Sequence, residues 1–373
     1  MATASTVDTA QVKLEDDTLR RIKKLADIES DDITQIYQLG DELGRGRFSV
    51  VNSALHMKEQ AKYAVKVVEN KSLADEENLE ALETEIDILR KLDHPHIVAL
   101  KEVVVCTSDT YIVMELLSGG ELFNRIVEQG RFSEHDAAEL FAQILLSMEY
   151  LHSLNIVHRD VKPENILYVS QGSTQIKLID FGYAGLWAPD KELSGLCGTP
   201  DYVAPEVLSW YDEDDNGTPY GKGSDLWSLG VLLYVILSGC SPFSAEEEEA
   251  ILQLVAQAKY EFHESEWATV SESAKDLIKK LLVVAPAQRM TMPEMLEHPW
   301  LKEAVANGRG AIDEKLKLKE VAKAAAETPV PPSSTKPVAD PSPTKGPAID
   351  HPEIQPRVEG VGKKGLAGCC TIS

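Results

Sequence analysis

The sequence HRDVKPEN at residues 158–165, followed by IDFG at residues 179–182, decides the fold of this chain. The two stretches supply two aspartates, an asparagine and a lysine. Carboxylate and amide oxygens suit Mg²⁺, and a lysine neutralises the negative charge of a phosphate. Phosphoryl transfer depends on such groups converging at one point, so these residues indicate a site for a metal-bound phosphate.

A glycine-rich stretch upstream supports a phosphate site. The sequence GRGRFSVV at residues 44–51 follows a strand-like segment. Gly44 and Gly46 let the backbone approach a polyphosphate closely and direct its N–H groups at the oxygens. Ser49 stands where the usual pattern has a third glycine, so this motif taken alone is equally consistent with an ordinary hairpin turn.

A lysine and a glutamate complete the expected phosphate site. Lys66 ends the strand-like sequence YAVK at residues 63–66, and Glu85 lies in a predicted helix over residues 76–92. An ion pair between them would hold Lys66 against the α- and β-phosphates. The alternative is a solvated surface pair, which the motifs downstream disfavour.

Taken in order, these motifs resemble the eukaryotic protein kinase family over residues 37–301. Later landmarks agree: GTP at 198–200, APE at 204–206, DLWSLG at 225–230 and HPW at 298–300. The resemblance implies that Asp160 accepts the proton of a substrate hydroxyl and that Lys162 meets the γ-phosphoryl charge. Asn165 and Asp180 would hold Mg²⁺, so ATP and Mg²⁺ are the implied cofactors.

The same resemblance implies roles for residues between the motifs. Glu206 and Arg289 are expected to form a buried ion pair, and Asp225 to anchor the catalytic loop. An internal spine would consist of Leu89, Leu100, His158 and Phe181. Val51, Ala64 and Leu167 would contact adenine, Met114 would be the gatekeeper, and Glu115 and Leu117 would form the hinge. The remaining residues of the ATP-binding set are Gly44, Gly46, Lys66 and Glu121.

The order of predicted elements indicates an α+β fold with two lobes. Residues 37–115 read as β-branched strands interrupted by one helix, and residues 118–301 read mostly as helices. The expected architecture is therefore a small antiparallel sheet with one regulatory helix, followed by a larger helical lobe, with a ligand cleft between them. This is the bilobal protein-kinase fold.

Two features indicate the kind of kinase. Lys162 is typical of loops that act on Ser or Thr, and the sequences LSGGELFNRI at 117–126 and CGTP at 197–200 resemble the calcium/calmodulin-dependent kinase group. In that group Glu121 and Glu164 face the peptide, which favours basic residues before the target hydroxyl; Thr199 completes the substrate-binding set. The alternative for Glu121 is contact with the ATP ribose alone.

Rival functions are a pseudokinase scaffold and a kinase of lipids or small molecules. Loss of Lys66, Asp160, Asn165 or Asp180 would favour the scaffold, yet all four are present. The APE sequence at 204–206 and the peptide-binding loop favour protein substrates.

The activation loop departs from relatives that an upstream kinase switches on. Gly195 replaces their phosphorylated Thr, so no phosphate can form there to bind Arg159. Ser194 could substitute for that Thr, or Asp190 or Glu192 could supply a permanent negative charge. We expect activity without phosphorylation at position 195.

Two kinds of segment bear on whether calcium, alone or with calmodulin, regulates the protein. Residues 302–327 occupy the place of a regulatory, calmodulin-binding helix and contain four lysines between 315 and 323, but lack an aromatic anchor. Calmodulin binding and an ordinary solvated helix both fit this pattern, and the basic helix predicted at Leu19–Leu25 is a second, weaker candidate. The acidic insertion at 210–219 opens like an EF-hand loop but has Gly223 at the twelfth position, so we interpret it as a surface insertion.

Composition limits the partners and the compartment. The net charge of −24 at pH 7 excludes nucleic acid, because a polyanion would be repelled. The five cysteines lack the spacing of a metal site or a disulfide framework, and no apolar run approaches the ~20 residues of a membrane span. We expect a cytoplasmic protein with a polar N-terminal extension at 1–36 and a disordered, Pro-rich tail at 328–373.

The sequence ends in CTIS at residues 370–373, which matches the farnesylation signature C-a-a-X. One lipid chain binds membranes only marginally, so a second signal is needed. Cys369 could be palmitoylated, and the lysines at 363–364 would attract anionic lipid. These features predict a membrane anchor at Cys370 on a flexible tail.

Substituting Cys370→Ser should therefore move the protein from the membrane to the soluble fraction of cells, because the prenyl acceptor is lost. Fractionation followed by immunoblotting measures the shift, and Cys240→Ser serves as the control. An unchanged membrane fraction would refute the anchor.

Overall fold

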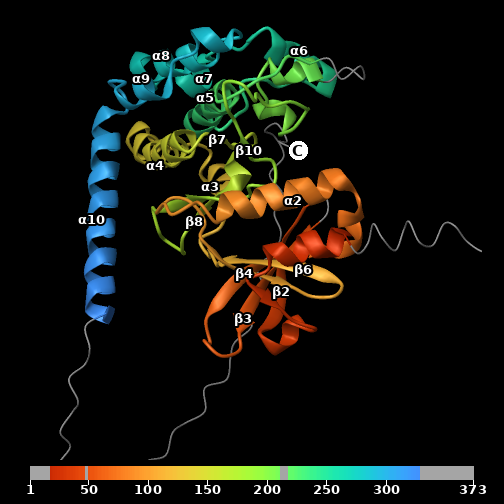
Figure 1. Cartoon of the computed structure of the whole chain (residues 1–373). Coiled ribbons are helices and arrows are strands. Elements are labelled where there is room, and N and C mark those ends of the chain that lie inside the picture. The colour runs from red at the N-terminus through yellow and green to blue at the C-terminus, as the bar shows by residue number, and fades with distance from the viewer. Residues whose placement is uncertain (1–16, 47–48, 211–216, 328–373) are drawn as a thin grey trace, which may run out of the picture. The chain divides into compact units, whose positions relative to one another are not determined.

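The computed structural model describes residues 17–46, 49–210 and 217–327 (Figure 1). Its smaller lobe is built on a six-stranded sheet in the order β1-β5-β6-β4-β3-β2. All neighbouring strands are antiparallel except β1 and β5, which pair in parallel at one edge. The strands are β1 Ile28–Glu29, β2 Tyr37–Arg45, β3 Ser49–His56, β4 Lys62–Glu69, β5 Leu100–Val105 and β6 Asp109–Glu115.

Helix α2, Glu76–Leu89, lies between β4 and β5 in the sequence and belongs to the smaller lobe. Asp75 begins it by accepting hydrogen bonds from the backbone N–H groups of Glu77 and Asn78, at 3.0 and 3.3 Å. Its apolar residues follow helical spacing and are buried in the core: Leu79, Leu82, Ile86 and Leu89. The predicted helix over 76–92 is thus present and ends three residues earlier.

The predicted polar extension at 1–36 contains part of the fold. Residues 17–25 form a helix whose Ile22 and Leu25 are buried in the main core, and β1 adds a strand to the sheet. Ile33 and Tyr37 belong to a second, smaller core under the sheet. The residues from 17 onward therefore pack as part of the smaller lobe.

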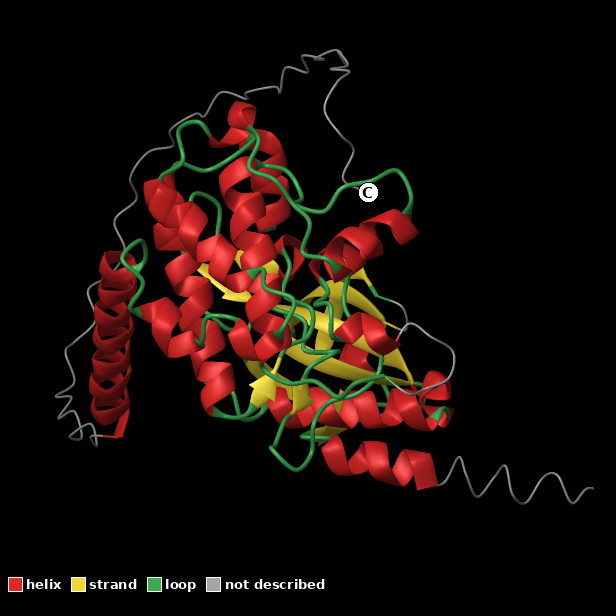
Figure 2. Ribbon diagram, turned by 90° about the horizontal axis from the view of Figure 1, so that it is seen from above, coloured by secondary structure: helices red, strands yellow, loops and turns green. Residues whose placement is uncertain are grey.

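The larger lobe is mainly helical (Figure 2). Its helices are α3 Leu122–Gln129, α4 Glu134–Ser153, α5 Gly223–Ser238, α6 Glu248–Ala256, α7 Glu264–Trp267, α8 Glu272–Leu281, α9 Met292–Leu296 and α10 Lys302–Glu327. Two short antiparallel pairs carry the loops of the site: β7 Ile156–Val157 with β10 Gly185–Leu186, and β8 Ile166–Tyr168 with β9 Ile176–Leu178. The 3-10 turns are Ile33–Gln35, Asn70–Ala74, Pro163–Asn165, Pro200–Tyr202, Val207–Trp210 and Pro286–Gln288.

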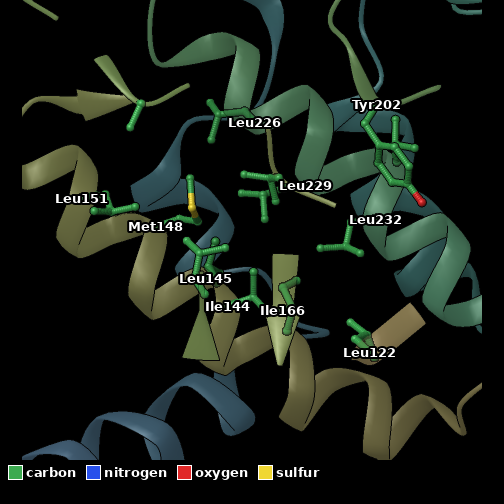
Figure 3. Packing of buried hydrophobic residues seen from close by; sticks show 14 of the residues in the cluster. Leu122, Ile144, Leu145, Met148, Leu151, Ile166, Tyr202, Leu226, Leu229 and Leu232 are labelled. Atoms are coloured by element: carbon green, nitrogen blue, oxygen red, sulfur yellow. The ribbon is translucent and has the colours of Figure 1, made fainter. Parts of the chain in front are cut away.

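Helix α5 is the centre of the larger lobe. Its residues from Ser224 to Ser238 are all buried, which explains why the sequence there is apolar on every face. Figure 3 shows Leu145 and Met148 of α4 facing Leu229 of α5, with Ile166 of β8 beside them. The short β-strands of the site therefore rest on a packed helical base.

Helix α10 begins at the larger lobe, shortly after α9 (Figure 1). Its first turns are attached to the larger lobe, because Val305 is buried and Arg309 forms a 2.8 Å ion pair with Glu149 of α4. Among the described residues, no helix combines the length and apolarity needed to cross a membrane.

The expected ion pair between Glu206 and Arg289 is present and buried. The Arg289 Nη1 and Nη2 atoms donate to the two carboxylate oxygens of Glu206 at 2.7 and 2.6 Å. Arg289 Nε donates to the backbone carbonyl of Val283, and Nη1 and Nη2 also donate to the carbonyls of Gly223 and Val284. This arginine therefore joins the start of α5, the segment after α8 and the APE sequence.

Substituting Arg289→Ala should lower the free energy of unfolding of the larger lobe by about 3–5 kcal/mol, because the Glu206 carboxylate is left buried without its partner. Urea unfolding followed by the fluorescence of the buried Trp227 and Trp267 measures the change. Lys302→Ala is the control, since its ion pair with Glu297 is 67% and 69% exposed and should contribute less than about 1 kcal/mol. Equal effects of the two substitutions would contradict the role of burial.

Candidate active site

The catalytic-loop residues predicted from the sequence meet around Asp160, which is buried. Lys162 Nζ lies 2.9 Å from Asp160 Oδ2 and donates to Thr199 Oγ1 at 2.7 Å, and Thr199 Oγ1 donates to Asp160 Oδ1 at 3.1 Å. Asn165 Nδ2 donates to Asp160 Oδ2 at 2.8 Å. The carboxylate thus keeps a fixed orientation, as a proton acceptor for a substrate hydroxyl requires.

Asp225, in the first turn of α5, anchors this loop as expected. Its carboxylate accepts hydrogen bonds from the backbone N–H groups of His158 and Arg159, at 3.0 and 2.9 Å, and lies 2.8 Å from His152 Nε2. Burial would raise the pKa of Asp225, but these donors lower it below its usual value. The ionised carboxylate holds Arg159 at a φ of 67°, a left-handed conformation that non-glycine residues rarely adopt.

Gly198 approaches the same loop from the activation segment. Its φ is 99°, and a Cβ there would lie 2.8 Å from the carbonyl oxygen of Arg159. Only glycine fits without moving one of the two backbones. This close approach places the adjacent Thr199 beside Asp160.

The predicted pair of Lys66 and Glu85 joins β4 to α2. Lys66 Nζ donates to the two oxygens of Glu85 at 2.6 and 2.8 Å and lies 3.7 Å from Asp180 Oδ1. Burial would lower the pKa of Lys66, but the charges of Glu85 and Asp180 raise it. The lysine therefore stays cationic, as a phosphate-binding group must.

Asp180 and Asn165 fit the predicted metal site. Burial would raise the pKa of Asp180, but the charge of Lys66 and the N–H of Gly182 lower it, so the carboxylate is ionised at neutral pH. Both hydrogen bonds that the described residues make with the Asn165 side chain use Nδ2, so Oδ1 remains available to a cation. In the described part of the chain, no cluster of three or more His, Cys, Asp or Glu side chains could hold a metal ion. Two oxygen donors suit Mg²⁺, which takes its other ligands from water and phosphate.

The glycine-rich stretch forms the turn between β2 and β3. Gly44 pairs with Val51 across the two strands, and the N–H of Gly46 donates to the carbonyl of Ser49 at 2.8 Å. Residues 47–48 at its tip lie outside the described residues. Val51 is in turn opposite Lys66 on β4, so the turn and the lysine share one end of the sheet.

The predicted adenine-binding residues line the segment that connects the lobes. Ala64 of β4 pairs with Met114 of β6, and Leu167 of β8 bridges to Glu121. These residues are half-buried, as the walls of a ligand site are expected to be. Each therefore lies at the boundary between the two lobes.

The predicted hinge residues differ in how their polar groups are used. Glu115 Oε1 accepts hydrogen bonds from Lys177 Nζ at 2.5 Å and from the N–H of Ala99 at 2.7 Å. Leu117 follows β6, and among the described residues its backbone N–H and C=O make no backbone hydrogen bond. Leu117 can therefore offer both groups to a purine edge, whereas the Glu115 side chain serves to fix the hinge.

The predicted spine residues come together from both lobes. Leu89 and Phe181 are buried in the main core, and Leu100 packs against it. The Phe181 ring meets the His158 ring edge-on, with centroids 5.1 Å apart. Phe181 thus packs against the catalytic loop at His158.

Comparison with known proteins agrees with this geometry. Residues 37–301 match the family model described as protein kinase domain. The chain belongs to the protein kinase family. It is 43% identical to myosin light chain kinase A of Dictyostelium discoideum over 290 residues, which covers 78% of this chain and 95% of that protein. It is also 41% identical to human calcium/calmodulin-dependent protein kinase type 1B over 292 residues, which covers 77% and 82% of the two chains.

This kinase also carries an acidic cluster beside the catalytic loop. Burial, and then repulsion by Glu164, raises the pKa of Glu121. Burial also raises the pKa of Asp201, and the charges of Glu164 and Glu248 add to it. Glu164 Oε2 is buried and has no hydrogen-bond partner among the described residues. The sequence predicted Glu121 and Glu164 as substrate-binding residues but did not predict Asp201. The feature that could have indicated Asp201 is its position two residues after Thr199.

The activation segment of the kinase already provides Arg159 with hydrogen-bond acceptors. Its Nε atom donates to the carbonyl of Tyr183 at 2.5 Å, and Nη1 donates to the carbonyl of Ser194 and the hydroxyl of Tyr220, both at 3.4 Å. Gly195 has a φ of 84°, which suits glycine and disfavours the threonine of other kinases. The segment is thus tied to Arg159 without a phosphate. The predicted lipidation residues, Cys369 and Cys370, lie outside the described residues.

Phosphatase treatment of the pure kinase should leave its initial rate of phosphate transfer within about twofold of the untreated rate, because neutral acceptors already hold Arg159. Mass spectrometry verifies that no phosphate remains, and Ser194→Ala controls for the neighbouring hydroxyl. Loss of activity after phosphatase treatment would show that a phosphorylated residue is required.

Proposed function

We propose that this kinase transfers the γ-phosphoryl group of Mg-ATP to serine or threonine hydroxyls of protein substrates. The observation that carries the proposal is the position of Lys162, which lies 2.9 Å from the Asp160 carboxylate and bonds Thr199. A cation beside the base can neutralise charge on the γ-phosphoryl group as the base takes a proton. The names of the myosin light chain and calcium/calmodulin-dependent relatives support the same reaction class.

The reaction follows from the arrangement of the side chains. The substrate hydroxyl oxygen forms a bond to the γ-phosphorus while the bond from that phosphorus to the bridging oxygen of ADP breaks. The hydroxyl proton passes to Asp160, and Lys66 and Lys162 offset phosphate charge at either end. Mg²⁺ held by Asp180 and Asn165 would neutralise further charge on the phosphates.

The pseudokinase alternative is disfavoured by geometry as well as by sequence. Lys66, Asp180, Asn165 and Asp160 are all in place, and Lys66 is already paired with Glu85. A binding scaffold has no need of a charged lysine held between two carboxylates at the boundary of the lobes. We therefore place catalysis ahead of a scaffold role.

We further propose that substrates carry a basic residue, arginine above all, before the target hydroxyl. The support for this proposal is that Glu164 Oε2 has no hydrogen-bond partner among the described residues, and that burial and then the charge of Glu164 raise the pKa of Glu121. A guanidinium can bind two oxygens at once and relieve that repulsion. Calmodulin is proposed as a regulator on the names of the relatives and the basic character of α10.

An oriented peptide library with ATP labelled at the γ-phosphate tests these proposals. Wild-type enzyme should label Ser or Thr peptides, and Asp180→Ala should reduce the rate at least a hundredfold because a metal ligand is lost. Parallel reactions with and without Ca²⁺/calmodulin test the regulator. Undiminished transfer by Asp180→Ala would overturn the assignment of the site.

The basic preference is read from the same library. Glu164→Gln should reduce the preference for an upstream arginine by about tenfold, because one charged partner of the guanidinium is removed. Peptides without a basic residue should be phosphorylated at a similar rate. Glu128→Gln, an exposed position on α3, is the matched control. An arginine preference that survives Glu164→Gln would exclude this residue as the determinant.

A further inference from the structure

The helix at residues 17–25 lies alongside α2, as the red and orange helices of Figure 1 show. Arg21 connects the two helices through three hydrogen bonds. Its Nε and Nη2 atoms donate to the two carboxylate oxygens of Glu83 at 2.9 and 2.6 Å, and Nη1 donates to Glu76 at 2.6 Å. A planar guanidinium that binds one carboxylate with two parallel bonds fixes orientation as well as distance.

These contacts lie on the face of α2 opposite to the active site. Glu83 precedes Glu85 by two residues, which corresponds to a rotation of about 200° around a helix of 3.6 residues per turn. Glu76 lies seven residues before Glu83 and so shares its face. Arg21 therefore binds the outer face of α2, while Lys66 contacts Glu85 on the inner face.

The other end of α2 is held by the same N-terminal segment. Arg90, which ends the helix, donates from Nη2 to the carbonyl of Leu25 at 2.5 Å and to Asp27 Oδ1 at 3.0 Å. Asp27 is fixed to β5, because its Oδ2 accepts from the N–H of Val103 at 2.8 Å and its own N–H donates to the Val103 carbonyl at 2.9 Å. Residues 17–27 thus connect both ends of α2 to the sheet.

We propose that Arg21 is a positioning residue for phosphate transfer, holding α2 where Glu85 can pair with Lys66. The proposal rests on the proposed kinase function, because it concerns how the ATP-binding lysine is placed. Glu85 can orient Lys66 only while α2 lies against the sheet, so any population in which α2 moves away binds ATP phosphates poorly. The two parallel hydrogen bonds from Arg21 to Glu83 favour the state in which α2 lies against the sheet over the state in which α2 has moved away.

A positioning role and a purely structural role have different kinetic consequences. If only a fraction of the enzyme has α2 in place, the apparent dissociation constant for ATP rises as the inverse of that fraction, and saturating ATP restores the competent state. The KM for ATP then rises while kcat changes little. Partial unfolding lowers kcat and leaves the KM of the remaining folded enzyme unchanged.

The experiment compares Arg21→Ala, Glu83→Gln and Arg20→Ala in the full chain. Arg21→Ala and Glu83→Gln disrupt the same pair of hydrogen bonds, one by changing the donor and the other by changing the acceptor. Each should raise the KM for ATP about fivefold with kcat changed by less than about twofold. Arg20→Ala removes the same charge from the same helix, but its partner Asp17 lies within that helix, so it should match wild type. Arg21→Lys keeps the charge without the two parallel hydrogen bonds and should recover part of the loss.

Thermal unfolding and direct titration with a fluorescent ATP analogue complete the test. An unchanged KM in both Arg21→Ala and Glu83→Gln, or a lower kcat at unchanged KM, would overturn the positioning role. Wild-type protein that binds the analogue but transfers no phosphate would refute the proposed function instead. In that case the titration still compares the affinities of the variants, so the two failures are distinguishable.

Discussion

The buried carboxylate of Asp225 is the constraint on which the active site depends. A carboxylate taken out of water is costly unless several donors surround it, and here the donors are His152 and two backbone N–H groups of the catalytic loop. Its place in the first turn of α5 adds the favourable field of a helix N-terminus. Because the same carboxylate fixes the left-handed Arg159, the residues that follow it must project toward Asp180 and Thr199. The hydrogen bonds to the buried Asp225 carboxylate therefore determine where the residues of the catalytic loop lie.

The part of the site in the larger lobe and the part in the smaller lobe are stabilised by contacts that differ in burial. In the larger lobe, Asp225 is completely buried at the start of a helix that is buried on every face. In the smaller lobe, α2 is held from outside by Arg21, whose side chain is 32% exposed. Exposed ion pairs contribute little each, so the contacts of Arg21 favour the position of Glu85 by a much smaller free energy than the buried donors of Asp225 favour the position of Asp160. Any influence that changes activity without unfolding the protein therefore acts most easily through α2.

The sequence predicts those parts of the site whose chemistry is local. The groups of residues 158–165 lie within one short loop, and helical spacing identifies α2 correctly. The sequence predicted a basic helix at residues 19–25, and the structure has a helix at residues 17–25. Its contacts with α2 were not predicted, because they join residues more than fifty positions apart. A helix with only Ile22 and Leu25 buried gives a weak periodic signal, and charged residues such as Arg21 usually indicate a solvated face. Asp201 was missed for a similar reason, since its environment depends on how the chain folds around Glu164.

The proposed recognition of basic substrates and the proposed catalysis share one short segment, because Glu164 lies between Asp160 and Asn165 in sequence. Among the described residues, one buried oxygen of Glu164 has no hydrogen-bond partner. Burial raises the pKa of both Glu121 and Asp201, and the charge of Glu164 adds to both shifts. The free enzyme therefore contains unrelieved repulsion beside the loop that carries the base. A cation that enters the cluster removes this repulsion and lets the carboxylates ionise fully. Since Asp225 already fixes the loop, that gain in free energy is not lost to rearrangement and supports the proposed binding of a basic peptide with its hydroxyl near Asp160.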